Sequence, residues 1–307
     1  MQRRALLSAL GTLALACGPR ERPALPSAPR VASAQDLIPA DLDVVARLDM
    51  ARIKGVLGAL ASDALARAAL SRAADESGED SEPQLLSALL AADRVYFAYR
   101  PGPRLLPLDR VLVAEGRFEP LLAPPPGFGR PRDLGADLRY WERKPGGVAA
   151  RATTARLYAQ GDRLRAFVSE AEIDAVERAL GSPPSERRLL PPSEGALSVA
   201  ARPALLARLA TGSLRELLEH AKAFALTFDL ESDRARLEAA LVLASAEDAA
   251  ALEGAVGALL QQLPRSLEGT TRLTAEQDRL VLRADVGRAA LAPLVACLSD
   301  AADGCSW

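Results

Sequence analysis

The chain has 307 residues, of which 49% are hydrophobic, enough for one large or two ordinary domains with a substantial core. Its 38 basic and 40 acidic residues give a net charge of −2, so the chain as a whole does not attract nucleic acid. His220 is the single histidine, which excludes a zinc site built from several histidines.

Residues 1–17 have the layout of an export signal. Arg3 and Arg4 make the start cationic, and the run at 5–16 is apolar. As a helix this run reaches only about 18 Å, short of the ~30 Å hydrocarbon core of a bilayer. We therefore expect a signal peptide on an exported protein rather than a lasting membrane span.

The end of this signal, Ala14-Leu15-Ala16-Cys17, resembles the lipobox of bacterial lipoproteins. The usual lipobox has leucine three residues and a small residue two residues before the cysteine, whereas here Ala14 precedes Leu15. The resemblance implies that Cys17 carries fatty acid such as palmitate and anchors the chain to the cell envelope. The residue after Cys17 is Gly18 rather than Asp. By resemblance to some Gram-negative lipoproteins, this implies that the anchor lies in the outer membrane and that the protein faces the periplasm or the surface.

The same residues leave an alternative open. Ala14-Leu15-Ala16 is also an A-x-A site for ordinary signal cleavage, which would release a soluble periplasmic protein with a free N-terminal Cys17. We predict lipidation, because a cysteine directly after the cleavage site is otherwise a rare coincidence.

Two proline-rich stretches divide the rest of the chain. Residues 18–35 contain few large apolar side chains and cannot bury enough surface to fold, so we predict a tether there. Residues 182–193 mark a second boundary. We therefore expect a first module at 36–190 and a second at 191–307.

Hydrophobic periodicity predicts the elements of the first module. Alternating apolar residues predict strands at 44–49, 94–100, 110–117, 138–143, 148–153, 155–160 and 163–168. Helical spacing predicts helices from 56 to 70, at 83–90 and after Ser169, where Ser169 and Glu172 form a capping box.

The second module repeats this order of elements. We predict strands at 196–201, 223–230, 236–243, 272–276 and 279–284, the second of which buries Phe224, Leu226 and Phe228. We predict helices at 213–220, from Ser245 to Leu263 and at 288–298, with Ser245 and Asp248 opening the long one.

Two hairpins indicate that the modules are copies. LYAQGDRL at 157–164 and LTAEQDRL at 273–280 agree at Leu, Ala, Asp, Arg and Leu. This predicts the α+β class, with two tandem ferredoxin-like modules, each an antiparallel sheet with helices packed on one face. The residues Pro39-Ala40-Asp41, Val44-Val45 and Asp49 also resemble the start of duplicated modules in some exported bacterial proteins, a resemblance that implies no function.

Cys297 and Cys305 remain if Cys17 takes lipid. They lie eight residues apart at the end of a predicted helix, and Gly304 lets the chain fold back, so in an oxidising envelope we predict a disulfide between them. The alternative is two unpaired thiols. A metal or redox role is not expected, because the chain has no C-x-x-C spacing.

Few residues indicate chemistry. His220 lies at the end of a predicted helix, where it interacts favourably with the helix dipole, and is not expected to be a general base. Asp229, Glu231 and Asp233 alternate at a hairpin and are interpreted as solvated rather than as a cation site. Tyr140-Trp141 is interpreted either as a contact patch or as hairpin packing. We predict no catalytic, cofactor-binding or metal-binding residues.

These observations favour a lipid-anchored envelope protein that binds a partner in the envelope or supports a complex, without catalysis. The expected partners are the membrane, through the N-terminal lipid, and another envelope component, but not nucleic acid. Two alternatives stay open. One is a membrane-tethered hydrolase that uses Asp and Glu carboxylates. The other is a soluble periplasmic binding protein, which requires ordinary cleavage before Cys17.

Overall fold

The computed structural model describes residues 31, 33–55, 82–101, 107–121, 123–144, 154–182, 185, 188–209, 212–231, 234–260 and 271–287. Several predictions from the sequence lie outside these residues: the signal with Cys17, the tether up to residue 30, the helix from 56 to 70, the strand at 148–153, Asp233, and the C-terminal helix with Cys297 and Cys305.

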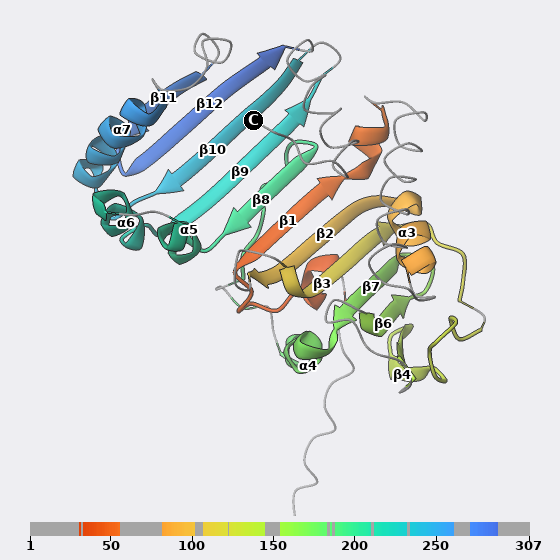
Figure 1. The fold of residues 1–307 in the computed structure, drawn as a ribbon. Helices are drawn as coiled ribbons and strands as arrows, with labels where there is room; N and C mark the ends of the chain where they lie inside the picture. Colours follow the sequence, from red (N-terminus) through yellow and green to blue (C-terminus); the bar gives the residue numbers. More distant parts are fainter. Residues whose placement is uncertain are drawn as a thin grey trace, which may run out of the picture.

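Twelve strands form one sheet in which all neighbours are antiparallel, in the order β11-β12-β10-β9-β8-β1-β2-β3-β7-β6-β5-β4 (Figure 1). With the helices that pack on it, the sheet confirms the α+β class. The strands are β1 (Val44–Asp49), β2 (Ala92–Pro101), β3 (Pro107–Gly116), β4 (Arg132–Gly135), β5 (Leu138–Glu142), β6 (Thr154–Gln160), β7 (Leu164–Ser169), β8 (Leu197–Ala201), β9 (Ala223–Leu230), β10 (Arg234–Val242), β11 (Thr271–Glu276) and β12 (Arg279–Gly287).

The described helices lie around the sheet (Figure 1). They are the 3₁₀ turns η1 (Ala34–Leu37) and η3 (Glu170–Glu172), and the α-helices α3 (Glu82–Ala91), α4 (Ile173–Gly181), α5 (Pro203–Leu209), α6 (Gly212–Glu219) and α7 (Ala246–Leu260). A short helical stretch at 50–55 follows β1. Within the described part of the chain, no helix has the length and apolar character needed to cross a membrane.

The two predicted modules share one sheet instead of forming two. β1 and β8, the first strands of the two halves, pair with each other antiparallel, so that Val45 lies opposite Ala200. Outward from this junction the order is β1-β2-β3-β7-β6 on one side and β8-β9-β10-β12-β11 on the other. The prediction of separate sheets is wrong because β1 and β8 each have one edge that their own half leaves without a partner, and pairing over five residues satisfies the backbone groups of both strands.

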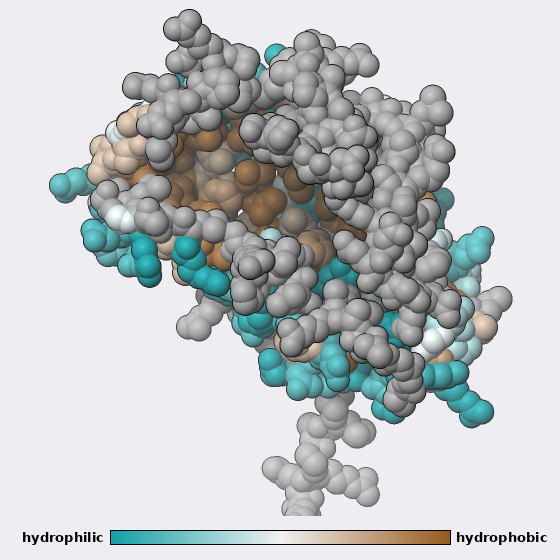
Figure 2. Space-filling model, in the orientation of Figure 1, coloured by the Kyte–Doolittle hydropathy of each residue, from teal (hydrophilic) through white to brown (hydrophobic). Residues whose placement is uncertain are grey.

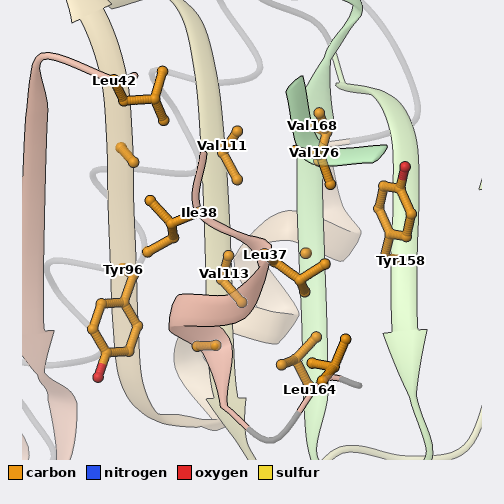
Figure 3. Packing of buried hydrophobic residues seen from close by; sticks show 14 of the residues in the cluster. Leu37, Ile38, Leu42, Tyr96, Val111, Val113, Tyr158, Leu164, Val168 and Val176 are labelled. Carbon is orange, nitrogen blue, oxygen red and sulfur yellow. The ribbon is translucent and has the colours of Figure 1, made fainter. Parts of the chain in front are cut away.

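The first half of the sheet is covered on both faces. On one face, η1 and α4 cover a core that includes Leu37, Val111 and Tyr158 (Figure 3). On the other face, α3 contributes Leu85 to a second core with Trp141 and other strand residues. The prediction of helices on one face is therefore wrong for this half, because its strands are apolar on both sides.

The folded body begins earlier than the predicted boundary at residue 36. Val31 and Ala34 are buried in the core beneath η1. The backbone N–H of Ser33 donates to Asp36 over 2.9 Å, a bond of the capping box that starts η1. The last residues assigned to the tether therefore belong to the fold.

A second capping box, predicted for the helix after β7, is absent. The Ser169 hydroxyl instead accepts the backbone N–H of Arg110 over 2.9 Å, and Glu172 binds the Arg100 guanidinium over 2.8 Å. Both side chains tie this turn to neighbouring strands β2 and β3. The long-range partners replace the local ones because the carboxylate of Glu172, 2% exposed, needs a charged partner.

Candidate binding face

One face of strands β8, β9, β10 and β12 is apolar across all four strands. The register places two rows of side chains side by side on this face. We call these eight residues the apolar face: Val199, Leu226, Ala239 and Leu282 in one row, and Leu197, Phe228, Leu237 and Ala284 in the next. Successive side chains of a strand alternate between faces, so the period of two in the sequence creates this surface directly.

The described helices cover only one end of this face. α5, α6 and α7 pack on the neighbouring row, where Phe224, Leu241 and Leu280 contribute to a separate core. All eight residues of the apolar face remain half-buried and belong to no core cluster of the described residues. Figure 2 shows a hollowed brown surface over these strands, with α7 at its edge.

The floor of this hollow offers a bound molecule no hydrogen bonds. None of its eight side chains carries a polar group, and the backbone groups of the four strands are used in the antiparallel ladder. A polar group placed on such a surface without a partner loses its bonds to water at a cost of about 1–3 kcal/mol. The surface therefore suits hydrocarbon.

The apolar face continues across the junction between the halves. Leu48 of β1 lies opposite Leu197, and Ala46 lies opposite Val199. Phe97 of β2 follows in the same row as Ala46 and stacks against Tyr99 at 5.2 Å between ring centroids. The hollow thus runs toward the core under α3, to which Leu48 and Phe97 also contribute.

The opposite face of β10 and β12, and of β11 beside them, carries charged side chains. Arg283 of β12 reaches Glu238 at 3.0 Å and Glu276 at 3.5 Å, and Arg236 reaches Asp285 at 3.3 Å. These side chains are between 37% and 56% exposed, which is typical of a solvated ladder of ion pairs. We call these five residues the charged face. One side of the sheet therefore faces water, and the other requires an apolar cover.

The structure pairs two of the three acidic residues at this hairpin with arginines. Asp229 pairs with Arg52 at 2.5 Å, and Glu231 pairs with Arg234 at 2.6 Å. These two carboxylates therefore form ion pairs with arginine side chains, at the place where a metal cation would need them as ligands. Among the described residues, no three of the His, Cys, Asp and Glu side chains gather as a metal site.

The aromatic pair at 140–141 is packing and not a surface patch. Tyr140 is buried on one face of the sheet, 5.6 Å from the Tyr158 ring, and Trp141 is buried on the other. The guanidinium of Arg156 lies 4.4 Å above the Tyr140 ring and donates to the Tyr158 hydroxyl over 3.1 Å. Burial raises the pKa of Tyr158, which keeps its hydroxyl protonated.

Arg156 also fixes α4 to the sheet. It contacts Glu177 of α4 and binds Glu142 of β5 at 2.7 Å. Burial disfavours its charge, but bonds to Tyr158 and Glu177 more than compensate and raise the pKa of Arg156. This cluster is a structural clamp, because the two terminal nitrogens of Arg156 bind side chains of β5, β6 and α4.

His220 lies apart from the apolar face and from these clusters. It is exposed directly after α6, at the helix end where the sequence placed it. Its position agrees with the expected interaction with the helix dipole.

The sequence did not predict the apolar face as a candidate site, for a specific reason. The alternation in β9 predicts a buried face, whereas the described helices leave that face half-covered.

No protein-family model and no curated protein matches the chain. Among solved structures, three crystal forms of TP0453 are similar in fold. Form I is 14% identical, with 86% of this chain and 96% of that chain covered at a TM-score of 0.49. Form III is 12% identical, covering 88% and 99% at 0.48, and form IV is 12% identical, covering 86% and 96% at 0.47.

Proposed function

We propose that this chain is a lipid-anchored envelope protein that binds another envelope component through the apolar face, without catalysis. The observation that supports the proposal is the difference between the two sides of one set of strands. Their charged face is solvated, whereas their apolar face is a hollow that described helices cover at one end only. A contiguous apolar surface that the described helices cover only in part is typical of binding sites.

The anchor is the second part of the proposal. Cys17 follows an apolar signal in a lipobox-like sequence, and proline-rich residues separate it from Val31, which is buried in the folded body. An acylated Cys17 would hold the folded body at the envelope membrane, with the outer membrane favoured by Gly18. Recognition would then take place close to the bilayer.

The duplicated architecture is part of the same proposal. We infer two tandem α+β modules, because the hairpins β6–β7 and β11–β12 occupy equivalent places on either side of the junction, with β6 and β11 outermost in this comparison. These are the two hairpins that align in sequence. The modules depart from the ferredoxin-like order, in which a further strand separates the two that flank the first helix, since β1 pairs directly with β2.

The test of the anchor is the intact mass of the mature protein extracted from membranes. We expect a chain that begins at Cys17 with added fatty acyl mass and that partitions into detergent. A Cys17→Ser variant should lose the acyl mass and the partitioning. A wild-type chain that begins at an unmodified Cys17 would contradict the anchor and favour a soluble periplasmic protein.

A further inference from the structure

Strand β11 forms one end of the twelve-stranded sheet (Figure 1). It pairs with β12 on its inner edge, and no described strand pairs with its outer edge. The outer edge of such a strand presents backbone N–H and C=O groups that can pair with another extended chain. At the other end of the sheet, β4 is shorter and its register is shifted between Asp133 and Gly135. Of the two ends, β11 is therefore better suited to the addition of a strand.

One contact shows which residues of β11 direct their backbone groups outward. The backbone N–H of Ala275 donates to the carboxylate of Glu253 of α7 over 3.3 Å, so this N–H points away from β12. Successive residues of an antiparallel strand alternate in this respect. Leu273 and Ala275 therefore direct their backbone groups to the outer edge, whereas Thr274 between them directs its groups to β12.

The charges at this edge are incomplete in the single chain. Arg283 of β12 binds Glu238 and Glu276. Arg272 of β11 lies directly opposite Arg283, is exposed, and pairs with no acidic side chain of the described residues. Like charges in directly opposite positions destabilise a sheet. A carboxylate brought to the outer edge of β11 would therefore complete the ladder of ion pairs.

The backbone and the charges together select how β11 would pair with a second copy of itself. Two antiparallel registers oppose the outward groups and keep most of the strand paired, one centred on Leu273 and one on Thr274. The first sets Arg272 opposite Thr274 of the second copy. The second sets Arg272 opposite Glu276 on both sides of the two-fold axis. It also opposes Leu273 to Ala275, and each such pair exchanges both of its backbone hydrogen bonds.

Thr274 lies on the axis in this second register. Its hydroxyl oxygen is buried and has no hydrogen-bond partner within the described part of the chain. Threonines directly opposite each other on neighbouring strands can form a hydrogen bond. The second copy would therefore supply a partner that the single chain lacks.

The flank of α7 beside this edge is built of small residues. Positions three or four apart lie on the same side of a helix, so Ala250 and Gly257 lie on the side from which Glu253 reaches β11. Ala250 is exposed, and a Cβ added at Gly257 would meet nothing within 4 Å. The distance between packed helices depends on the side chains at their contact. This flank therefore leaves room for α7 of a second copy across the axis.

We propose that two copies of this chain associate through β11, antiparallel about Thr274, to form one continuous sheet. The interface is isologous, since each residue meets its partner in both directions. Glu253 releases the N–H of Ala275, whose acceptor becomes the C=O of Leu273 in the second copy. The inference does not rest on the proposed function, because the apolar face takes no part in it.

The test measures association and then traps the register. The full-length Cys17→Ser chain, which lacks the anchor, is followed by sedimentation velocity over a range of concentrations, and we expect a reversible monomer–dimer equilibrium. For the trap, Cys297→Ser and Cys305→Ser are added and Thr274→Cys is introduced. Directly opposite residues have Cβ atoms about 4.5–5.5 Å apart, close to the separation in a disulfide. Under mild oxidation we expect most of the protein to become a disulfide-linked dimer.

Thr227→Cys in the same background is the matched control. Thr227 lies on the same side of the sheet as Thr274 but on β9, between Ser198 and Glu238 of the neighbouring strands. Pairing of two β11 edges keeps the two copies of this position far apart. We therefore expect about tenfold less disulfide-linked dimer than with Thr274→Cys.

Charge reversal tests the register without a new cysteine. Arg272→Glu opposes two carboxylates on each side of the axis, and we expect the dissociation constant of the dimer to rise about tenfold at low salt. The same change places a carboxylate opposite Arg283, so the single chain should stay folded. Adding Glu276→Arg restores opposite charges across the axis and should recover most of the affinity.

Three results would overturn the inference. A monomer at every concentration would show that the outer edge of β11 accepts no second copy. Equal cross-linking of Thr274→Cys and Thr227→Cys would show random collision. A dimer that Arg272→Glu leaves unchanged would place the interface elsewhere. None of these results alters the expected acyl mass on Cys17, so this inference and the proposed function fail separately.

Discussion

Strands β2, β3, β6 and β7 and strands β9, β10 and β12 belong to the same sheet, but only the first group is covered on both faces. In the first half, helical segments and the 31–42 segment enclose apolar side chains such as Leu157 and Tyr158 almost completely. In the second half, one face carries ion pairs and the other keeps a half-buried hollow. The comparison teaches that strands in equivalent places of one sheet are enclosed on both faces on one side of the junction and are only half-covered by described helices on the other.

The largest effect should come from removing buried side chains in the first half. Leu157 is 2% exposed, so Leu157→Ala leaves a cavity, and we expect the free energy of unfolding to fall by about 2–5 kcal/mol. Leu226→Ala removes the same atoms from the half-buried apolar face and should cost about 1 kcal/mol. Urea unfolding of both full-length variants measures the difference. Equal losses would contradict the unequal coverage of the two halves.

The next effect compares two arginines. Arg156 is 9% exposed and packs on the Tyr140 ring, so we expect Arg156→Ala to lower the free energy of unfolding by about 1–3 kcal/mol, mainly through lost packing. Arg283 on the charged face is 45% exposed, and Arg283→Ala should cost about 0.5 kcal/mol or less. Thermal unfolding of both variants in low and high salt distinguishes the two effects, because salt should screen only the ion pairs of Arg283.

A smaller effect concerns the helix that covers one end of the apolar face. The Ser245 hydroxyl accepts the backbone N–H of Asp248 over 3.1 Å at the start of α7. Ser245→Ala should cost about 1 kcal/mol, and Ser245→Asn should restore most of it. Hydrogen exchange of α7 amides reports the loss directly. Unchanged exchange would mean that packing alone holds α7 in place.

The smallest effect is a pH dependence in the first half. Burial raises the pKa of Asp41, but the hydrogen bond and charge of Arg100 outweigh it, and the net shift is downward from 3.8. A lowered pKa in the folded state means that the pair stabilises the fold above about pH 4, and that this stability is lost as the pH falls through the folded pKa. Below pH 4, the free energy of unfolding of the Asp41→Asn variant should therefore fall less steeply than that of the wild-type chain. An unchanged acid profile would contradict the role of the pair.

Much of the fold was predictable because strand patterns are local. The period of two located β1 and β9 with their observed bounds, and the Ser245–Asp248 pattern located the start of α7. β4 and α5 were missed, since four residues and seven residues give too little periodicity to detect.

The arrangement of the strands was not predictable in the same way. Pairing of β1 with β8 joins residues 149 to 157 positions apart, and no local pattern encodes it. The same is true of the candidate site. Alternation showed that Leu226 and Phe228 share a face, but whether helices cover that face is decided by distant segments.

Hydrogen exchange tests the comparison of the two halves most directly. The amides of the full-length Cys17→Ser chain are measured strand by strand. We predict that amides in β3 and β7, whose two faces are both covered, exchange more slowly than amides in β9 and β10, because strands with fewer buried apolar contacts open at a lower free energy. Equal exchange in the two pairs of strands, or slower exchange in β9 and β10, would contradict the unequal coverage of the two halves.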